Sequence, residues 1–308
     1  MRYIRVKFSD GKFRRVPLVD PMRPTDIKEV PENGWIAEEK IDGSLTLMYL
    51  IDGAVAYVNR KGVNKTDVYP ELTDDEARYY RSKGLSIIQG ETYALSGGTD
   101  SWEAFLKRDL LQNPTEARQR MRDYPLRFKA FDILMNRGDW IIDRPILERK
   151  RMLESIVPKT EEVSVAKYST QPKRFTERMR RDKTVEGVVF KKLPDGYESG
   201  KSKHWRKLKF KKEADVVITG YEKGEGKRKD IGALKVGVYD KKTGGVKEVA
   251  NVGTGFTDVE LRDIKRRLDR GEKLFAKVEY MKVGTQGRLR VPVFKGLRED
   301  ITTKETHL

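Results

Sequence analysis

Short segments of alternating apolar and polar residues, separated by glycine turns, constrain the fold of this chain more than any other feature of its sequence. Residues Tyr3–Val16 alternate on both sides of Asp10-Gly11, a pair suited to a tight turn with positive φ, and therefore predict a β-hairpin. A second strand pair is predicted at Trp35–Glu39 and Leu45–Leu50. Further strands are predicted at Ala54–Arg60, Ile87–Ala94, Leu126–Leu134, Val185–Lys191 and Trp205–Phe210.

Helical patterns lie between these strands, at Asp74–Lys83, Ser101–Leu111 and Pro145–Ile156. The first ends at Gly84, and the third begins with a proline at a first-turn position, where its missing N–H costs nothing. Strands and helices mixed in this way indicate an α+β domain.

The pattern changes after the basic run Lys207–Lys212, where short strands with glycine turns take over and one helix, Asp258–Arg270, interrupts them. Five short strands and a helix predict a small OB-type β-barrel, although other small β folds also fit. We therefore predict two domains, residues 1–212 and 213–308, with a basic loop at Glu222–Asp230. The five strands are expected at Ala214–Tyr221, Ala233–Tyr239, Val246–Val252, Leu274–Met281 and Arg288–Phe294.

The charge of the chain points to a polyanionic partner. Lysine and arginine (65) exceed aspartate and glutamate (48), which gives +17, and nucleic acid is favoured over anionic lipid because no basic amphipathic helix stands out. The chain has no cysteine and only two histidines, which excludes disulfides, thiol nucleophiles and cysteine- or histidine-based zinc sites. No apolar run approaches the ~20 residues of a membrane span and no secretory signal is visible, so we expect a cytoplasmic protein.

One lysine is placed to act as a nucleophile. Lys40-Ile41-Asp42-Gly43 lies between two predicted strands, so Lys40 is expected where a strand gives way to a turn. Alone, this pattern also fits an ordinary surface lysine before a turn. Further motifs follow it in a fixed order, however: Asn59-Arg60-Lys61-Gly62, Gln89-Gly90-Glu91, Phe131-Asp132, Val185–Lys191 and Trp205–Lys209.

This succession resembles the covalent nucleotidyltransferases, which comprise ATP-dependent DNA ligases, RNA ligases and messenger-RNA capping enzymes. The C-terminal segments Gly232–Tyr239 and Val252–Thr257 look like the OB domain of ATP-dependent DNA ligases, and Arg290–Phe294 with Arg298–Asp300 looks like the sixth motif of that family. The chain is most similar to the minimal ligases of phages and some bacteria. The resemblance implies an antiparallel-sheet-rich nucleotidyltransferase domain followed by an OB-fold domain.

The resemblance also implies how the reaction would be carried out. Lys40 would attack the α-phosphate of ATP, and its pKa is expected to be lowered by Lys207, Lys209 and a bound Mg²⁺ (or Mn²⁺). Glu91 and Glu186 would supply hard carboxylate oxygens to that metal. Asp42 completes the expected catalytic residues. Each glutamate also fits a simpler interpretation, as an exposed strand residue or a solvated turn residue.

The nucleotide contacts are implied in the same way. Phe131 would stack on adenine, although ordinary core packing is a strong alternative for it. Glu38 would read the adenine edge with its side chain or through nearby backbone, and Arg60 and Glu91 would contact the ribose. Lys207 and Lys209 would share one strand face and contact the α-phosphate. Arg298, together with Arg290, would orient the pyrophosphate.

The sequence departs from the family pattern at several positions. Leu45 stands where these ligases usually carry an arginine, so the contacts of that arginine must come from elsewhere. In the sixth motif, Val293, Gly296 and Ile301 replace residues that are usually basic.

The function predicted from the sequence is an ATP-dependent DNA ligase that seals 5′-phosphate/3′-hydroxyl nicks in duplex DNA, as a monomer, through a lysyl-AMP intermediate and a DNA-adenylate. Three alternatives remain open: an RNA ligase, a capping nucleotidyltransferase that uses GTP, and a noncatalytic basic protein that binds nucleic acid through the barrel.

Overall fold

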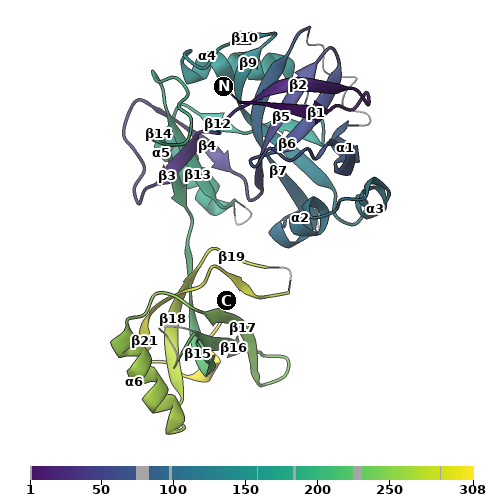
Figure 1. Cartoon of the computed structure of the whole chain (residues 1–308). Helices are drawn as coiled ribbons and strands as arrows, with labels where there is room; N and C mark the ends of the chain where they lie inside the picture. The colour runs from purple at the N-terminus through teal and green to yellow at the C-terminus, as the bar shows by residue number, and fades with distance from the viewer. Residues whose placement is uncertain are drawn as a thin grey trace. The chain divides into compact units, whose positions relative to one another are not determined.

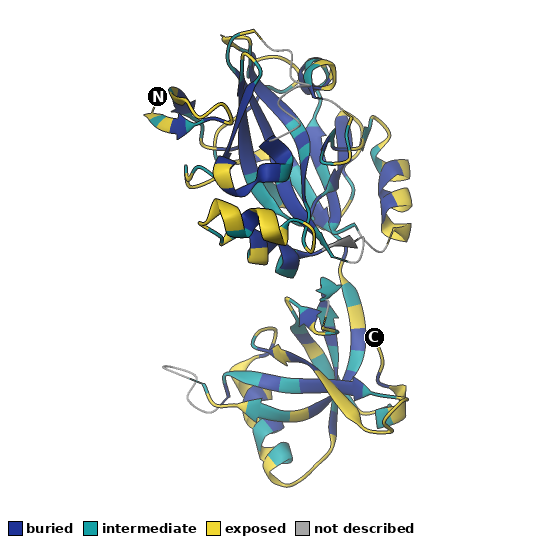
Figure 2. Ribbon diagram, turned by 90° about the vertical axis from the view of Figure 1, so that its right-hand side faces the viewer, coloured by how far each residue is buried: buried dark blue, intermediate teal, exposed yellow. Residues whose placement is uncertain are grey.

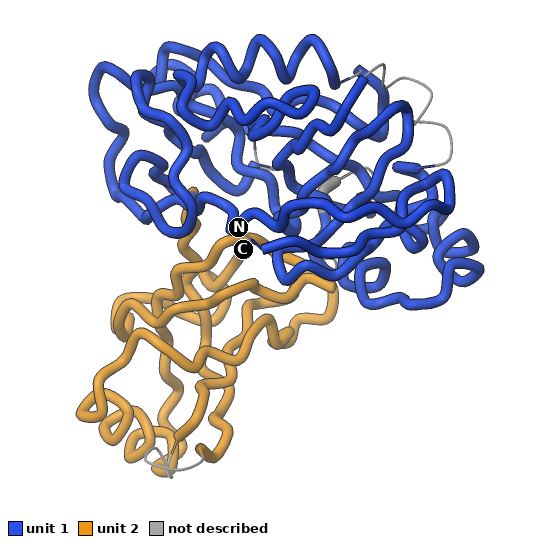
Figure 3. Tube along the Cα trace, turned by 45° about the horizontal axis from the view of Figure 1, so that its top comes forward, with its two compact units in different colours: residues 1–209 blue, residues 210–308 orange. Residues whose placement is uncertain are grey.

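Two β-sheets form most of the N-terminal part of the chain. The computed structural model describes residues 2–73, 83–96, 99–157, 159–182, 185–224, 231–284 and 286–308. The chain divides into two compact units, Met1–Lys209 and Phe210–Leu308 (Figure 3). Nearly all of the helix predicted at Asp74–Lys83 and most of the loop predicted at Glu222–Asp230 lie outside the described residues.

The larger sheet of the first unit has the strand order β10-β9-β7-β5-β6, with β8 added to β7 and β11 added in parallel to β9 (Figure 1). Alternate residues of strand β5, which lies between β7 and β6, enter two different cores: Met48 and Leu50 pack in one, and Leu47 and Tyr49 in the other. Burial on both faces explains why this strand is continuously apolar rather than alternating. The strands are β5 Ser44–Ile51, β6 Ala54–Asn59, β7 Ser86–Ser96, β8 Thr99–Asp100, β9 Leu126–Asn136, β10 Asp139–Trp140 and β11 Val163–Val165.

The second sheet of this unit has the order β12-β4-β13-β14-β3, and its one parallel pair is β14 with β3. Its strands are β3 Arg23–Asp26, β4 Trp35–Lys40, β12 Tyr168–Ser169, β13 Gly187–Lys192 and β14 Lys201–Lys209. The predicted pairing of the strands around residues 35–39 and 45–50 is therefore wrong. Strands β4 and β5 follow each other in the chain, but they belong to different sheets.

The N-terminal hairpin is confirmed. Strands β1 Arg2–Lys7 and β2 Phe13–Leu18 pair antiparallel, and Gly11 in the turn has φ +79°, which favours glycine. Val6 and Val16 of the hairpin are buried in the core that also contains Leu47 and Tyr49.

Helices and short helical turns surround the sheets of the first unit. Helix α2 begins after Ser101, whose side chain accepts a hydrogen bond from the Ala104 N–H, and Pro145 is the N-cap of α4 rather than a first-turn residue. Helices α3 and α5 were not predicted, because each is mostly polar; α5 buries only Phe175, Thr176 and Met179. Among the described residues, no helix is long and apolar enough to cross a bilayer. The helical elements are η1 Thr66–Val68, α1 Pro70–Thr73, α2 Trp102–Asp109, α3 Pro114–Arg120, α4 Ile146–Ile156 and α5 Pro172–Arg181.

The second unit is an antiparallel five-stranded sheet in the order β17-β16-β15-β18-β21, with a small β19–β20 pair and one helix. Its apolar side chains form a core of their own, and both units bury their strands more than their helices and loops (Figure 2). This confirms the α+β fold with a C-terminal OB-type unit. The elements are β15 Lys212–Glu222, β16 Ala233–Tyr239, β17 Val246–Val252, α6 Asp258–Asp269, β18 Leu274–Tyr280, β19 Lys282–Val283, β20 Leu289–Arg290, β21 Val293–Arg298 and η3 Thr303–Glu305.

The last predicted strand, Arg288–Phe294, is wrong as a single element. Val291 has φ +49°, a left-handed conformation that a β-branched residue rarely adopts and that interrupts a ladder. The chain therefore forms two strands, one on each side of Val291.

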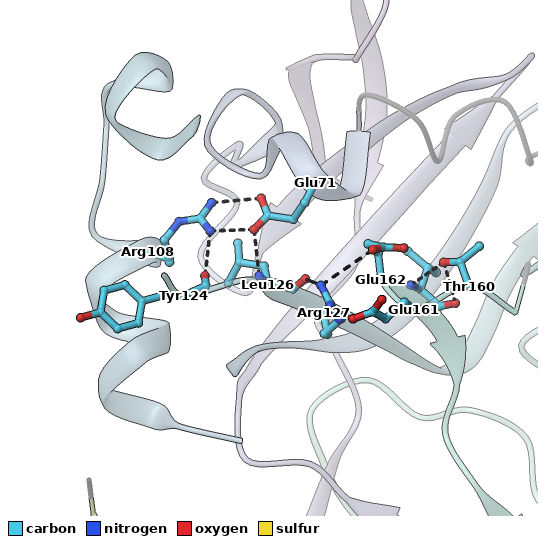
Figure 4. Close-up of polar contacts among 9 residues, drawn as sticks. Glu71, Arg108, Tyr124, Leu126, Arg127, Thr160, Glu161 and Glu162 are labelled. Carbon is cyan, nitrogen blue, oxygen red and sulfur yellow. Dashed lines mark hydrogen bonds and ion pairs between the residues drawn. The ribbon is translucent and has the colours of Figure 1, made fainter. Parts of the chain in front are cut away.

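A buried ion pair connects the helical layer to the larger sheet. Arg108 of α2, whose side chain is fully buried, donates to both carboxylate oxygens of Glu71 on α1 and to the backbone carbonyls of Tyr124 and Val68 (Figure 4). Glu71 also accepts from the N–H of Leu126 at the start of β9. One guanidinium and one carboxylate thus hold α1, α2 and β9 together.

We predict that Arg108→Met lowers the free energy of unfolding of the first unit by about 3–5 kcal/mol, because it leaves the Glu71 carboxylate buried without its charge partner. Urea denaturation followed by tryptophan fluorescence measures this, since all four tryptophans lie in the first unit. Arg120→Met, which breaks an exposed pair with Glu116, is the control and should cost less than about 1 kcal/mol. Equal losses in the two variants would contradict the prediction.

Candidate active site

Lys40 is the last residue of β4, where the chain leaves one sheet for the other. The turn that follows packs closely against β7: a Cβ atom on Gly43 would lie 2.3 Å from the backbone oxygen of Thr92 and 3.0 Å from the side chain of Glu91. Only glycine fits at that distance. Gly43 therefore allows the end of one sheet to lie beside a strand of the other, which brings Lys40 and Glu91 into one site.

The Lys40 ammonium forms an ion pair with Glu186. The Lys40 Nζ atom donates to Glu186 Oε2 over 2.6 Å, and Lys209 Nζ lies 3.4 Å from the other oxygen of the same carboxylate. Glu186 stands immediately before β13, whose Gly187 pairs with both Lys40 and Lys209 in the sheet. Sheet register thus places these three charged side chains next to one another.

Carboxylates dominate the electrostatics around Lys40. Burial acts to lower the pKa of Lys40, but the charges of Glu186 and Glu91, the Glu186 hydrogen bond and the charge of Asp42 outweigh burial and raise this pKa above its usual value. The prediction that Lys207 and Lys209 lower the pKa of Lys40 is therefore wrong for this arrangement of charges. The reason is that the acidic groups act more strongly on Nζ than the two lysines do.

Glu91, on β7, is strongly perturbed. Burial raises the pKa of Glu91 to about 8, with further upward contributions from the charges of Glu186 and Asp42, and the Lys40 ammonium only partly opposes them. Mg²⁺ is commonly held by one or two carboxylates together with substrate phosphates. Glu91 and Glu186 fit such a site: both carboxyl groups act on Lys40, and a bound cation would displace the proton that the raised pKa of Glu91 retains. Among the described residues, no group of three or more acidic or histidine side chains could hold a metal ion by itself.

A pocket of about 270 Å³ opens beside Lys40. This is near the lower end of the ~300–1,000 Å³ range of small-molecule sites. Six of the residues singled out from the sequence line it: Glu38, Lys40, Arg60, Glu91, Phe131 and Lys207. Asp42, Glu186 and Lys209 do not line the pocket, but Asp42 and Glu186 act on Lys40 and Lys209 pairs with Glu186.

Glu38 does not have a carboxylate available to a ligand. Its side chain is buried and forms ion pairs with Lys150 of α4 and with Lys191 of β13, the latter over 2.7 Å. The Lys191 ammonium also donates to the Phe131 carbonyl and lies 4.8 Å from the centre of the Phe131 ring and 4.1 Å from that of Trp205. Phe131 is half-buried, so it belongs both to the core and to the pocket wall.

Two lysines that contact Glu38 were not singled out from the sequence: Lys191, which lines the pocket, and Lys150, which does not. Lys191 follows the apolar run Val188–Phe190 and shares a strand face with Val189, which also lines the pocket, so its position on a buried strand was a usable signal. Burial lowers the pKa of Lys191 to about 8, although Glu38 opposes the shift. Lys150 lies on α4, far away in sequence, and nothing local indicated its contact with Glu38.

The remaining predicted residues lie as follows. Lys207 and Lys209 are two residues apart on β14, and Lys207 lies 3.6 Å from Asp26. Leu45 lines the pocket where an arginine was expected. Arg298 belongs to the second unit, where its guanidinium binds Asp300 through two hydrogen bonds and Asp215 through one. No ligand contact of Arg298 follows from these interactions.

Comparison with known proteins identifies the family. The model of the ATP-dependent DNA ligase domain matches residues 18–209, and that of the ATP-dependent DNA ligase C-terminal region matches residues 227–274. The first match alone covers more than half of the chain and contains the whole candidate site. The chain belongs to the ATP-dependent DNA ligase family.

Individual relatives agree with this assignment. The chain is 29% identical over 278 residues to DNA ligase 2 of Thermofilum pendens, covering 83% of this chain and 46% of that protein. It is 30% identical over 280 residues to a probable DNA ligase of Dictyoglomus turgidum, covering 86% and 48%. A solved structure of mycobacterial DNA ligase D complexed with ATP and MES has a TM-score of 0.52 at 24% identity, covering 94% of this chain and 98% of that one. The chain spans about half the length of the curated relatives it matches.

The raised pKa of Glu91 predicts a pH-dependent stability. Between about pH 5 and pH 8 the folded chain keeps a proton on Glu91 that the unfolded chain has released, so stability falls as the pH rises through this range. Glu91→Gln cannot ionise and should be more stable than wild type at pH 8.5 by more than about 1 kcal/mol, with the difference disappearing near pH 5. Urea denaturation without added nucleotide or metal measures it.

The exposed Glu32→Gln serves as the matched control and should show no pH-dependent difference from wild type. A stability difference for Glu91→Gln that is the same at both pH values would contradict the raised pKa.

Proposed function

We propose that this protein is an ATP-dependent DNA ligase that seals nicks carrying a 5′-phosphate and a 3′-hydroxyl in duplex DNA. The observation that carries the proposal is Lys40 itself: its Nζ atom borders a pocket lined by Glu91, Phe131 and Lys207 and contacts Glu186, in a chain of the ATP-dependent DNA ligase family. A lysine that carries AMP covalently can pass it to the 5′-phosphate, which is a poor electrophile until it is activated in this way.

In the first step, the neutral Lys40 amine attacks the α-phosphorus of ATP. A P–N bond forms, the bond from the α-phosphorus to the bridging oxygen breaks, and pyrophosphate leaves. The amine must first lose a proton, and Glu186 Oε2, to which Nζ donates, is the first acceptor on the path by which that proton leaves. Lys207 and Lys209 lie on the same strand face and would stabilise the negative charge of the α-phosphate.

Glu91 and Glu186 would hold Mg²⁺ or Mn²⁺. When bound, the metal supplies positive charge beside the phosphate oxygens. Neutralising these two carboxylates removes the interactions that raise the pKa of Lys40, so that burial, which lowers this pKa, becomes dominant. The carboxylates thus keep Lys40 protonated until the reaction partners are in place.

Adenine would stack on Phe131, and Arg60 and Glu91 would contact the ribose; all three residues line the pocket. Glu38 would act indirectly, because its carboxylate is held by Lys150 and Lys191. By fixing Lys191 beside the Phe131 carbonyl and ring, Glu38 would set the shape of the base-binding end of the pocket.

The next two steps transfer AMP to DNA and seal the nick. An oxygen of the 5′-phosphate attacks the α-phosphorus of lysyl-AMP, the P–N bond breaks, and Lys40 recovers its amine. The 3′-hydroxyl then loses its proton and attacks the 5′-phosphorus, and AMP leaves. The net charge of +17 favours binding to the DNA backbone. We also propose, as expected from the sequence, that the protein acts in the cytoplasm as a monomer.

The alternatives predict different adducts or substrates. A capping nucleotidyltransferase would form a GMP adduct, and a noncatalytic binding protein would form none. An RNA ligase would form the AMP adduct but would seal RNA in preference to nicked DNA. The match to the C-terminal region of ATP-dependent DNA ligases supports DNA as the substrate.

We predict that Lys40→Ala abolishes formation of the covalent adduct with radiolabelled ATP, because Lys40 is the nucleophile of the proposed first step. Lys40→Arg should be equally inactive, since the guanidinium keeps its proton. Denaturing gels after incubation with ATP or GTP and magnesium give the measurement. Lys192→Ala, an exposed lysine of the same sheet paired with Asp195, is the control and should form the adduct at the wild-type rate.

Sealing of unadenylylated nicks by Lys40→Ala at near the wild-type rate would overturn the proposal. A GMP adduct in place of the AMP adduct would assign the chain to the capping reaction instead.

A second prediction concerns Arg298. If it orients pyrophosphate, Arg298→Ala should slow formation of the Lys40 adduct at least about tenfold, because a charge-stabilising donor is lost. Sealing of a nick that already carries 5′-adenylate should change little, since that step releases no pyrophosphate. The two rates are compared directly. Arg267→Ala, which breaks another ion pair of the second unit with Glu272, is the control.

Equal losses in both assays would indicate another role for Arg298: either it stabilises the fold through Asp215 and Asp300, or it contacts DNA. No loss in either assay would exclude it from the chemistry.

A further inference from the structure

The β1–β2 hairpin presents an unusual outer surface. Antiparallel pairing places Tyr3, Arg5 and Lys7 on the same face as Phe13 and Arg15, while Val6 and Val16 point into the core. Tyr3 is 48% exposed and Phe13 56% exposed, and Arg5 and Arg15 are exposed as well. We call Tyr3, Arg5, Phe13 and Arg15 the hairpin face. Figure 2 shows the hairpin at the side of the first unit, near the N-terminus.

The two arginines of the hairpin face stand directly opposite each other. Arg5 and Arg15 are cross-strand partners, and like charges in this arrangement destabilise a sheet. In the part of the chain that the structure describes, neither forms an ion pair with a carboxylate. The neighbouring cations differ, because Lys7 pairs with Asp67 and Arg14 with Asp10. Within the described part of the chain, no carboxylate therefore compensates the charges of Arg5 and Arg15.

Each of these arginines lies over an exposed aromatic ring on the opposite strand. The Arg5 guanidinium is 4.8 Å from the centre of the Phe13 ring, and that of Arg15 is 4.9 Å from the centre of the Tyr3 ring. These contacts fix the side chains diagonally across the hairpin. Two flat apolar rings thus flank a pair of cations on a surface where neither kind of group is otherwise needed for packing.

We propose that the hairpin face is a binding site for single-stranded nucleic acid. Arg5 and Arg15 would bind backbone phosphates, and Tyr3 and Phe13 would stack with unpaired bases, the combination used by proteins that bind single strands without sequence preference. A duplex offers phosphates but keeps its bases stacked inside, so it would leave the two rings exposed. The match to the model of the ATP-dependent DNA ligase domain begins at residue 18, where β2 ends, so that model does not include the hairpin face.

The site would add a second mode of DNA contact to the enzyme. An unpaired strand next to a break could be held by the hairpin independently of the chemistry at Lys40. The proposal does not require ligase activity, and its test is a binding measurement with a readout separate from catalysis.

The experiment measures binding of the full chain to a fluorescein-labelled oligothymidylate and to a labelled duplex, by fluorescence anisotropy over a range of salt concentrations. Tyr3→Ser/Phe13→Ser should weaken oligothymidylate binding at least about tenfold and leave duplex binding nearly unchanged, because only unpaired bases stack. Arg5→Ala/Arg15→Ala should reduce the log–log salt slope for the single strand by about 1.4, at about 0.7 for each phosphate contact.

Arg151→Ala/Lys159→Ala, at two other exposed positions of the first unit, is the charge-matched control and should leave single-strand binding unchanged. Tryptophan fluorescence during urea denaturation checks that the variants fold, and adduct formation with ATP should match wild type in all of them. Lys40→Ala should bind oligothymidylate normally, which separates this site from the proposed catalysis.

Wild-type binding of oligothymidylate by both hairpin variants would overturn the proposal. An equal loss of duplex and single-strand binding in Tyr3→Ser/Phe13→Ser would also overturn it, because the rings would then not be reading unpaired bases.

Discussion

The close approach of the turn after Lys40 to strand β7 is the constraint on which the site depends. Gly43 has no side chain, and any Cβ atom there would collide with the backbone of Thr92. Because the turn can lie against β7, a lysine at the end of one sheet meets a glutamate of the other, and the register of β13 brings Glu186 to the same place. Lys40 and Glu91 come from strands of two different sheets, and Glu186 comes from the residue before β13.

Charge balance around this turn gives the site its chemical character. Glu91 and Glu186 act to hold a proton on Lys40, and their carboxyl oxygens suit a divalent cation, which would displace the proton that Glu91 itself keeps below about pH 8. Lys150 and Lys191 neutralise Glu38, another residue that lines the pocket, so its carboxylate is not available to a cation. One pocket thus combines an end suited to metal and phosphate with an end suited to a flat base.

Sequence order was sufficient to predict much of this. Most of the longer strands of both units, helices α2, α4 and α6, and six residues of the pocket wall follow from alternation, capping and a succession of motifs that resembles a known family. The sequence also predicted the N-terminal hairpin, because Asp10-Gly11 between two alternating runs favours a tight turn between two strands. Helices α3 and α5 escaped prediction because tertiary burial of a few residues, rather than an apolar periodicity, stabilises them.

The sequence by itself determined which residues are proposed to carry the chemistry, since residue type and order along the chain are enough to single out Lys40, Glu91 and Glu186. Only the tertiary structure decided their charge states and partners. The pairing of β4 with β13 instead of β5, the contact of Lys150 with Glu38 and the raised pKa of Lys40 all arise from groups distant in sequence. Burial and Coulomb interactions depend on distance in space, which no local pattern of residues specifies.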